Sequence, residues 1–347
     1  MKKIIYIIIV FFASIANILA CTRAVYIGEN GLVITGRTMD WKSDQETNIW
    51  AFPRGIKRDG KAGENSISWI SKYGSITTSA YDIATVDGMN EKGLSANILY
   101  LTESEYIKPL KNDKRKTLAI SMWVQYFLDN YATVNEAVKD MKKNIFYVVT
   151  TEIPNDGRQA GLHLSISDST GDSAIFEYID GELKIYHNKK YQVLTNSPEY
   201  CKQIAIQKYW ENINGTEFLP GTNRAVDRFA RASFYINAIP KTSDEKLGVA
   251  SVLSVMRNVS VPIGITTPNE PNISTTRWRT IADQKNKVYF YDSVFNENIF
   301  WIELKNIDFS KDQPIKKLTL TDNEYFTKNV ANKFKAVEKD LQFLPSE

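Results

Sequence analysis

The chain has 347 residues, of which 43% are hydrophobic and 24% charged, a composition typical of a globular protein with one large or two ordinary domains. The formal net charge is only +3 and no basic cluster stands out, which disfavours nucleic-acid binding. Two cysteines exclude a disulfide scaffold and a four-cysteine zinc site. The two histidines, His163 and His187, have no metal-ligand neighbours at a useful spacing, so we interpret both as structural and expect no metal and no cofactor.

The first 20 residues have the anatomy of a secretory signal peptide. A basic start at Lys2 and Lys3 precedes an apolar run, and small Ala20 stands at the junction. We therefore predict a signal peptide over 1–20, a single mature domain over 21–347, and export to the periplasm or the exterior. No second apolar run approaches the ~20 residues that span a bilayer, so we expect no membrane contact of the mature chain.

Cleavage after Ala20 would leave Cys21 with both a thiol and a free α-amino group. Their ordinary pKa values, about 8.5 and 7.7–8.0, allow proton exchange near neutrality. This is the arrangement of N-terminal nucleophile hydrolases. Three alternatives remain at this point: an acylated lipoprotein cysteine, for which Leu19 is bulky, a disulfide with Cys201, and an inert buried thiol.

The chain then continues as a hairpin. Residues 22–27 and 32–36 are β-prone and a turn signal separates them, so the hairpin begins at Cys21 itself. Its second strand would carry Arg37 and Asp40 back toward the thiol.

Short-period runs follow over 48–100, with turn signals at Asp87-Gly88 and Lys92-Gly93 and a central strand predicted over 95–100. Helical spacing predicts a helix over 118–130, and a capping box at Thr133-x-x-Glu136 opens another to about 142. Strands are predicted next, over 146–150, 162–166, 173–179, 183–186 and 191–194.

Ser197-Pro198 suits a helix start with proline at the first helical position, and that helix should run to about 210. Further helices are predicted over 228–236, from Thr242-x-x-Glu245 to about 256, and from Thr321. Strands over 278–282, 288–292 and 299–304 lie between the last two helices. Hairpins with helices in pairs predict a layered α+β domain, with two sheets stacked between helix layers.

Five motifs occur in one order along the chain: Cys21-Thr22-Arg23, Gly36-Arg37-Thr38-Met39-Asp40, Asn90-Glu91-Lys92-Gly93-Leu94, Leu194-Thr195-Asn196-Ser197-Pro198, and Leu219-Pro220-Gly221 with Arg228-Phe229-x-Arg231. Together they resemble the choloylglycine hydrolase family of bile salt hydrolases and penicillin V acylases, in particular its Gram-negative, Bacteroides-type branch. The resemblance covers nearly the whole mature chain. It implies a four-layer αββα N-terminal nucleophile fold, hydrolysis of a linear amide through a thioester, and a homotetramer.

The resemblance also implies a role for each matching residue. Cys21 matches the nucleophile, Arg37 the cation beside the thiol, and Asp40 the aspartate that hydrogen-bonds the terminal amine or the thiol. Asn196 matches the oxyanion donor, and Arg228 completes the charge network. Without the motifs, Arg37 would be interpreted as part of a surface salt bridge and Arg228 as a solvated charge. Asp40 and Asn196 would be interpreted as turn or capping residues.

Tyr100 departs from the pattern. Many bile salt hydrolases have asparagine where this chain has Tyr100, whereas penicillin V acylases often have tyrosine. The second oxyanion contributor is therefore open: a backbone N–H, or Tyr100 orienting another group. The aromatic residues Trp41, Trp50, Trp69 and Tyr81 either line an acyl pocket or pack in the core.

We accordingly expect a small-molecule amide substrate. Glycine- and taurine-conjugated bile salts are the leading expectation, with penicillin V and N-acyl homoserine lactones as alternatives within the same chemistry. The alternative from another class is a periplasmic lipoprotein that binds or supports other molecules and is anchored at Cys21.

Overall fold

The computed structural model describes residues 21–108, 112–154, 156–266, 274–320 and 325–346. The predicted signal peptide over 1–20 and the helix start predicted at Thr321 lie outside these ranges. The described residues that follow, from Tyr325 on, form short strands and a 3₁₀ turn.

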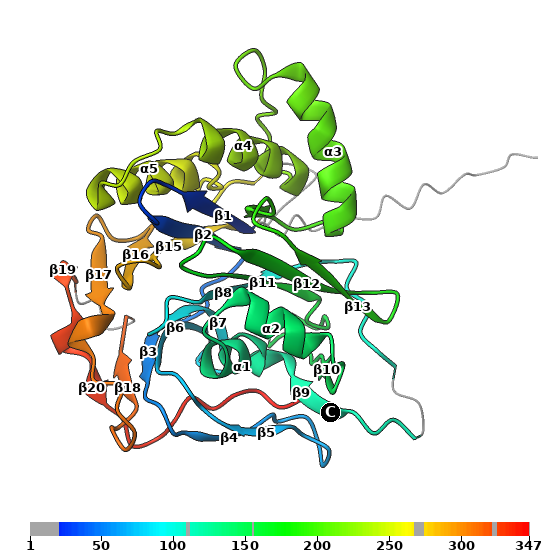
Figure 1. The fold of residues 1–347 in the computed structure, drawn as a ribbon, viewed down its shortest axis with the longest axis vertical. Coiled ribbons are helices and arrows are strands. Elements are labelled where there is room, and N and C mark those ends of the chain that lie inside the picture. The colour runs from blue at the N-terminus through cyan, green and yellow to red at the C-terminus, as the bar shows by residue number, and fades with distance from the viewer. Residues whose placement is uncertain (1–20, 109–111, 155, 267–273, 321–324, 347) are drawn as a thin grey trace, which may run out of the picture.

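Two large sheets stack face to face at the centre of the molecule (Figure 1). Sheet A has seven strands in the order β14 (Val193–Leu194), β1 (Cys21–Ile27), β2 (Val33–Trp41), β15 (Thr275–Asp283), β16 (Val288–Ser293), β17 (Phe300–Glu303) and β19 (Lys328–Asn329). Sheet B has nine strands in the order β13 (Glu182–His187), β12 (Ser173–Ile179), β11 (Leu162–Ser167), β8 (Ser95–Tyr100), β7 (Ala84–Asn90), β6 (Ser75–Ala80), β3 (Ile49–Phe52), β18 (Lys316–Leu318) and β20 (Lys335–Ala336).

Helices cover the outer face of each sheet. α4 (Ala225–Ala238) and α5 (Glu245–Asn258) pack on β1 and β2 of sheet A, and α3 (Tyr200–Ile213) packs on α4. α1 (Trp123–Asn130) and α2 (Val134–Met141) pack on sheet B (Figure 1). The predicted four-layer αββα architecture is confirmed.

Smaller elements complete the described chain. β9 (Lys116–Ala119) pairs with β10 (Phe146–Val149), and β4 (Lys57–Asp59) pairs with β5 (Ser68–Ile70). The described residues also form three 3₁₀ turns, η1 (Ile120–Met122), η2 (Leu304–Asn306) and η3 (Ala331–Lys333).

The β1–β2 hairpin occupies an interior position of sheet A, between β14 and β15. Cys21 pairs with Met39 and Arg23 with Arg37, so the hairpin begins at Cys21 as predicted. Every residue of β2 is buried, because helices cover one face and sheet B the other. The position of Cys21 is thus fixed by strand pairing and by packing on both faces.

Tertiary contacts overrode several local predictions. Asp87-Gly88 is not a turn: both residues lie within β7, paired with Asn97 and Ala96 of β8. The predicted helix over 118–130 is divided, because β9 extends to Ala119 to pair with β10 and the α-helix starts only at Trp123.

Two predicted helix starts were also misplaced. The Ser197–Pro198 peptide is cis and α3 begins at Tyr200, so Pro198 is not its first helical residue. α5 is capped by Asp244, which accepts from the N–H of Leu247, rather than by Thr242. The capping box predicted at Thr133 is confirmed in full.

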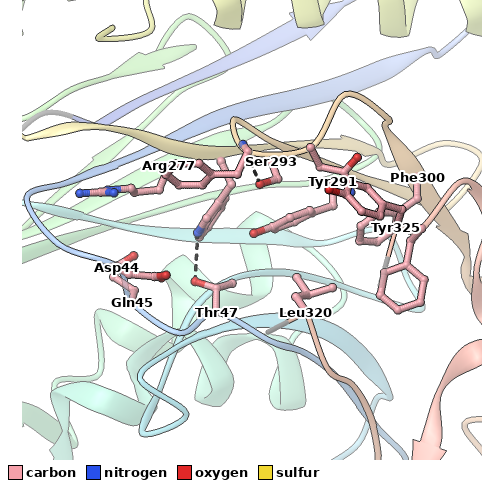
Figure 2. A pocket seen from close by; sticks show the side chains of 13 residues that line it. Asp44, Gln45, Thr47, Arg277, Tyr291, Ser293, Phe300, Leu320 and Tyr325 are labelled. Atoms are coloured by element: carbon pink, nitrogen blue, oxygen red, sulfur yellow. Dashed lines mark hydrogen bonds between the residues drawn. The ribbon is translucent and has the colours of Figure 1, made fainter. Parts of the chain in front are cut away.

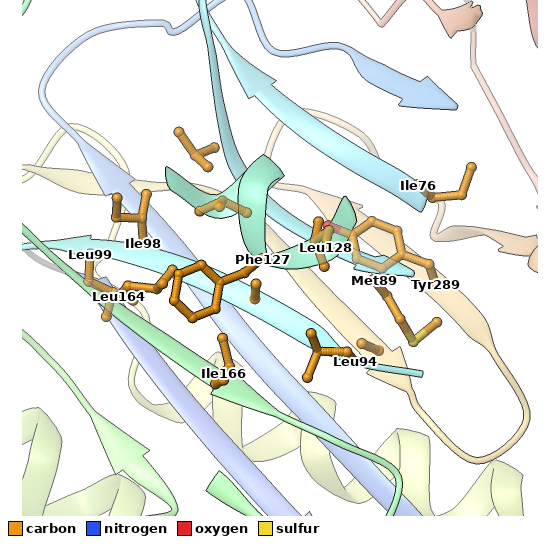
Figure 3. Close-up of a cluster of buried hydrophobic side chains, with 14 of the residues drawn as sticks. Ile76, Met89, Leu94, Ile98, Leu99, Phe127, Leu128, Leu164, Ile166 and Tyr289 are labelled. Carbon is orange, nitrogen blue, oxygen red and sulfur yellow. The ribbon is translucent and has the colours of Figure 1, made fainter. Parts of the chain in front are cut away.

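The core between sheet B and its helix layer is apolar and close-packed. Phe127 and Leu128 of α1 lie against Ile98, Leu164 and other buried side chains of the sheet (Figure 3). Burial of each such side chain contributes roughly 1.5–3 kcal/mol, which keeps the strands that face Cys21 in place.

Candidate active site

The backbone of Cys21 is held by two side chains that come from distant parts of the chain. Its nitrogen donates to Asn196 Oδ1 at 2.6 Å, and its carbonyl accepts from Arg228 Nη1 at 2.5 Å. Asn196 lies two residues after the edge strand β14, and Arg228 is in the first turn of α4. Two of the four residues that the family resemblance placed around Cys21 therefore meet at its backbone.

Arg228 is fully buried and each of its nitrogens has a partner. Nη1 also donates to Thr22 Oγ1 at 2.6 Å, Nη2 donates to Asn196 Oδ1 at 2.9 Å, and Nε donates to the carbonyl of Asn223 at 2.9 Å. Such a residue is a structural tie between α4 and β1 rather than a solvated helix charge.

Asn196 joins this network to sheet B. Its Oδ1 accepts from both Cys21 and Arg228, while Nδ2 donates to the carbonyl of Tyr100 at 2.7 Å. One amide hydrogen is thus committed to β8, and the other is the hydrogen that an oxyanion would need. The oxyanion role of Asn196 stays a prediction.

Arg37 lies beside the sulfur. Its Nη2 is 4.0 Å from Cys21 Sγ, 3.5 Å from Met39 Sδ and 3.0 Å from the carbonyl of Ile98, to which it donates. The guanidinium carbon lies 4.6 Å from the ring centroid of Trp278, a cation–π contact.

Burial raises the pKa of the Cys21 thiol above its ordinary value. The cation of Arg37 lowers it, as expected from the sequence, but burial has the larger effect. Cys21 therefore rests as a thiol at neutral pH, and a nucleophilic role requires a base to take its proton.

Asp40 is buried between two threonines. Its carboxylate accepts from Thr276 Oγ1 at 2.6 Å and from Thr38 Oγ1 at 3.2 Å, and burial raises its pKa to about 6 against the opposing attraction of Arg228. The thiol of Cys21 faces the backbone carbonyl of Asp40, at 3.8 Å, rather than the carboxylate. Sequence reasoning missed Thr276, because a threonine in a strand carries no local signal of its partner 236 residues away.

An apolar pocket, open to solvent at its mouth, is lined by Cys21 and Arg37 at its inner end. Its walls come from β2, the β6–β7 turn, β8, η1 and the segment after β10. The lining residues include Met39, Trp41, Ala80, Tyr81, Ile83, Val86, Ile98, Tyr100, Ile120, Ile153 and Leu162.

Two of the four aromatic residues suggested for an acyl pocket lie in it. Trp41 and Tyr81 line the pocket, and the Trp41 indole N–H donates to the Tyr81 hydroxyl at 3.0 Å. Trp50 and Trp69 instead donate their indole N–H groups to Asp82 and Asp129, at 2.9 and 2.8 Å, and lie outside the pocket. For those two residues the core-packing interpretation holds.

Tyr100, which departs from the bile salt hydrolase pattern, forms part of the pocket wall. Its ring packs on Trp41 with centroids 6.2 Å apart at 53°, and the Arg158 guanidinium lies 5.5 Å from the Tyr100 ring centroid. The Tyr100 side chain thus shapes the pocket, while its carbonyl anchors Asn196.

A second pocket lies beside the first and shares Gln45 with it, but it does not include Cys21 (Figure 2). Trp278 forms part of its wall, with the indole N–H donating to Thr47 Oγ1 at 3.1 Å. The Arg37 guanidinium lies over the face of the same indole ring.

The remaining candidates are structural. His163 is buried, with Nδ1 2.8 Å from Glu177 and Nε2 2.9 Å from the carbonyl of Thr195. His187 lies 2.7 Å from Asp172. Both cysteines are free, and Cys201 is exposed, so the disulfide alternative is wrong.

Neither a metal site nor a membrane span is found in the described ranges. No three side chains of the metal-ligating types gather there. None of the helices there has both the length and the apolar character that crossing a bilayer requires.

Residues 21–317 match the model of the family described as linear amide C–N hydrolases, choloylglycine hydrolase family. A penicillin V acylase from Pectobacterium atrosepticum is 49% identical over 311 residues, which are 84% of this chain and 83% of the relative. A bile salt hydrolase/transferase from Clostridium perfringens is 26% identical over 317 residues, 83% of this chain and 94% of the relative.

Solved structures agree with these matches. The structure of penicillin V acylase from Agrobacterium tumefaciens is 53% identical with a TM-score of 0.87, covering 94% of this chain and all of the other. A variant of the conjugated bile acid hydrolase from Clostridium perfringens, 23% identical, shares the fold with a TM-score of 0.75 over 88% of this chain and 99% of its own. This chain therefore belongs to the choloylglycine hydrolase family and is a hydrolase of linear amide C–N bonds.

Proposed function

We propose that this enzyme removes an aryloxyacetyl group from an N-acyl amide of the penicillin V type, through a thioester on Cys21. The observation that carries the proposal is the apolar pocket, rimmed by Trp41, Tyr81 and Tyr100, that opens directly at Cys21. Such a pocket suits a compact aromatic acyl group held with its carbonyl at the thiol.

In the first step the α-amino group of mature Cys21 accepts the thiol proton, and the sulfur attacks the amide carbonyl. A base is needed because burial keeps Cys21 protonated. Asn196 Oδ1 holds the nitrogen of Cys21, which orients that base toward the sulfur of its own residue.

The tetrahedral intermediate places its oxyanion near the uncommitted amide hydrogen of Asn196, with Arg37 stabilising the charge that develops around the sulfur. The protonated α-amine then gives its proton to the leaving amine, the C–N bond breaks and the thioester remains. Water, deprotonated by the same amine, attacks the thioester carbonyl and releases the carboxylic acid together with the thiol.

Two observations favour penicillin V over conjugated bile salts. The relatives that are 49% and 53% identical are penicillin V acylases, whereas the bile salt relative is 26% identical. Tyr100, typical of penicillin V acylases, lines the pocket. The sequence-based preference for bile salts is therefore replaced by a preference for penicillin V.

The test is kcat/KM on correctly processed protein for penicillin V, a glycine conjugate, a taurine conjugate and an N-acyl homoserine lactone. We expect penicillin V to lead by at least tenfold, which corresponds to about 1.4 kcal/mol of transition-state preference. Cys21→Ala, assayed in parallel, sets the background. A lead for either bile salt conjugate would reverse the substrate assignment while leaving the amide hydrolase mechanism standing.

We further propose export, cleavage after Ala20 and assembly of a homotetramer. The mechanism needs an unblocked amine at Cys21, and an acylated lipoprotein cysteine would lack it. Mass spectrometry of the mature N-terminus and light scattering of the purified protein test these points. An acylated Cys21 would contradict the proposed mechanism.

A further inference from the structure

Two polar rows face each other between the sheets, directly behind the thiol. On sheet A, Arg37 of β2 pairs with Thr280 of β15. On sheet B, Asp87 of β7 pairs with Asn97 of β8. The rows meet where Thr280 Oγ1 donates to Asp87 Oδ1 at 3.2 Å, and where Arg37 donates to the carbonyl of Ile98, the residue after Asn97.

The Asp87 carboxylate accepts hydrogen bonds from three side chains. Besides Thr280, its carboxylate accepts from the Tyr289 hydroxyl and, at 2.6 Å, from Asn97 Nδ2. All three donors are uncharged, and no cation of the described residues forms an ion pair with Asp87 within 4 Å. Donors of this kind stabilise the ionised carboxylate, which offsets part of the cost of burying it.

Two of the three guanidinium nitrogens of Arg37 lack a hydrogen-bond partner among the described residues. Its Nη2 is engaged, but neither Nε nor Nη1 has a hydrogen-bond partner among the described residues, and both atoms are buried. A buried cation needs an opposite charge nearby. Asp40 is held by two threonines and is attracted chiefly to Arg228. Burial raises the pKa of Asp87, and the attraction of Arg37 opposes that shift.

We propose that Asp87 is the buried counter-ion of Arg37 and acts as a positioning residue that holds this guanidinium, charged, beside the sulfur of Cys21. The thiolate and Asp87 then share the charge of one cation. Asp87 limits how strongly Arg37 attracts the thiolate, and so it keeps the thiol protonated until the base acts. The relevance of the proposal to catalysis rests on Cys21 as the nucleophile, but its test needs no substrate.

The ionisable groups around this arrangement are few. The thiol faces Arg37 and Asp40 from β2 and Arg228 from α4. Asp87 faces Arg37 from β2 and the Tyr289 hydroxyl from β16. Removal of the Asp87 charge therefore acts on the thiol mainly through Arg37.

The experiment is the pH dependence of Cys21 alkylation by iodoacetamide in Asp87→Asn and in the wild type, followed by mass spectrometry of the N-terminal peptide so that exposed Cys201 does not interfere. We expect the midpoint to fall by about 0.5–1 pH unit, as for one charge removed at an effective dielectric constant near 20. Alkylation at pH 7 should be about two- to threefold faster, because the thiolate fraction rises. The gain is smaller than the rise in thiolate, since a thiolate of lower pKa is intrinsically less nucleophilic.

Asp129→Asn is the matched control. It removes another fully buried carboxylate, which accepts from Arg58 and Trp69 on the far side of sheet B, so it should leave the midpoint unchanged. Tyr289→Phe removes one donor from Asp87 but leaves the Asp87 charge in place, so its midpoint should stay closer to that of the wild type than the midpoint of Asp87→Asn.

An unchanged midpoint in folded Asp87→Asn would overturn the proposal. If Asp87→Asn does not fold, Asp87→Ser removes the same charge, and an unchanged midpoint in that variant overturns the proposal instead. Because alkylation requires no turnover, this failure is distinct from failure of the proposed substrate assignment.

Discussion

The surroundings of Cys21 and the pocket above it lie side by side and are built in opposite ways. Around Cys21, the buried side chains of Asn196, after β14, and Arg228, from α4, form hydrogen bonds with each other and with the backbone of Cys21. The pocket is lined chiefly by apolar and aromatic side chains, several of them from turns. The first region fixes the reacting atoms through directional bonds, whereas the second is shaped by packing.

This difference predicts how the two regions respond to mutation. A buried polar network fails when one partner is lost, because the groups left behind remain buried without a partner. An apolar wall tolerates exchange of similar volumes and changes affinity by smaller steps. Substitutions near Cys21 should therefore act mainly on kcat, and substitutions in the pocket mainly on KM and on the choice of substrate.

The largest effect is expected for the nucleophile. Cys21→Ala should fold and show no turnover, and Cys21→Ser should be strongly impaired, since a hydroxyl is far less acidic than a thiol. Cys201→Ala is the matched control and should retain wild-type kcat, because Cys201 is exposed and unbonded to Cys21. Loss of activity in Cys201→Ala would contradict this picture.

Maturation should matter almost as much. A protein engineered to retain Ala20 on Cys21 should fold but lack turnover, because the proposed base is then part of an amide. Intact-mass measurement and a kcat assay on the same sample check this. Full activity in a verified uncleaved sample would remove the α-amine from the mechanism.

Asn196→Ala should lower kcat by about 10²–10³-fold with a smaller change in KM, because the oxyanion bond strengthens only as charge develops. Steady-state kinetics separate the two parameters. The variant also leaves Arg228 Nη2 and the nitrogen of Cys21 without their acceptor, so its thermal unfolding should be measured in parallel. A change confined to KM would place Asn196 in substrate binding instead.

Asp40 gives the network a pH-dependent stability. Its folded pKa, about 6, is above the unfolded value of 3.8, so protonation stabilises the folded state at low pH and this contribution is lost as pH rises through about 6. From pH 5 to 7.5 the free energy of unfolding of the wild type should fall by about 1 kcal/mol relative to Asp40→Asn. Denaturant titrations of both proteins at the two pH values measure this difference, and parallel curves would contradict it.

The smallest effects should separate a pocket tryptophan from a core one. Trp41→Phe should raise KM for penicillin V by about three- to tenfold, because it removes pocket surface and the hydrogen bond to Tyr81. Trp50→Phe should lower the melting temperature without changing KM, because Trp50 bonds to Asp82 outside the pocket. Equal KM changes in the two variants would contradict the assignment of Trp41 to the pocket and Trp50 to the core.

Local signals in the sequence were sufficient for the hairpin at Cys21, the capping box at Thr133 and the layered α+β class. The ordered motifs, through the family resemblance, pointed to Arg37, Asp40, Asn196 and Arg228 as partners of Cys21. All four lie around Cys21 in the structure, although Asp40 faces the thiol with its backbone carbonyl rather than its carboxylate.

Other features depended on contacts between residues far apart in the chain. Asp87-Gly88 has the composition of a turn but becomes a strand because β8 supplies a complete set of pairing partners. Trp41 and Trp50 look alike in the sequence, and only the stacking of the sheets brings one to the pocket and the other to Asp82. The sequence also places Arg37 near the thiol, but burial between two sheets decides that the thiol stays protonated, because desolvation outweighs the attraction of one cation.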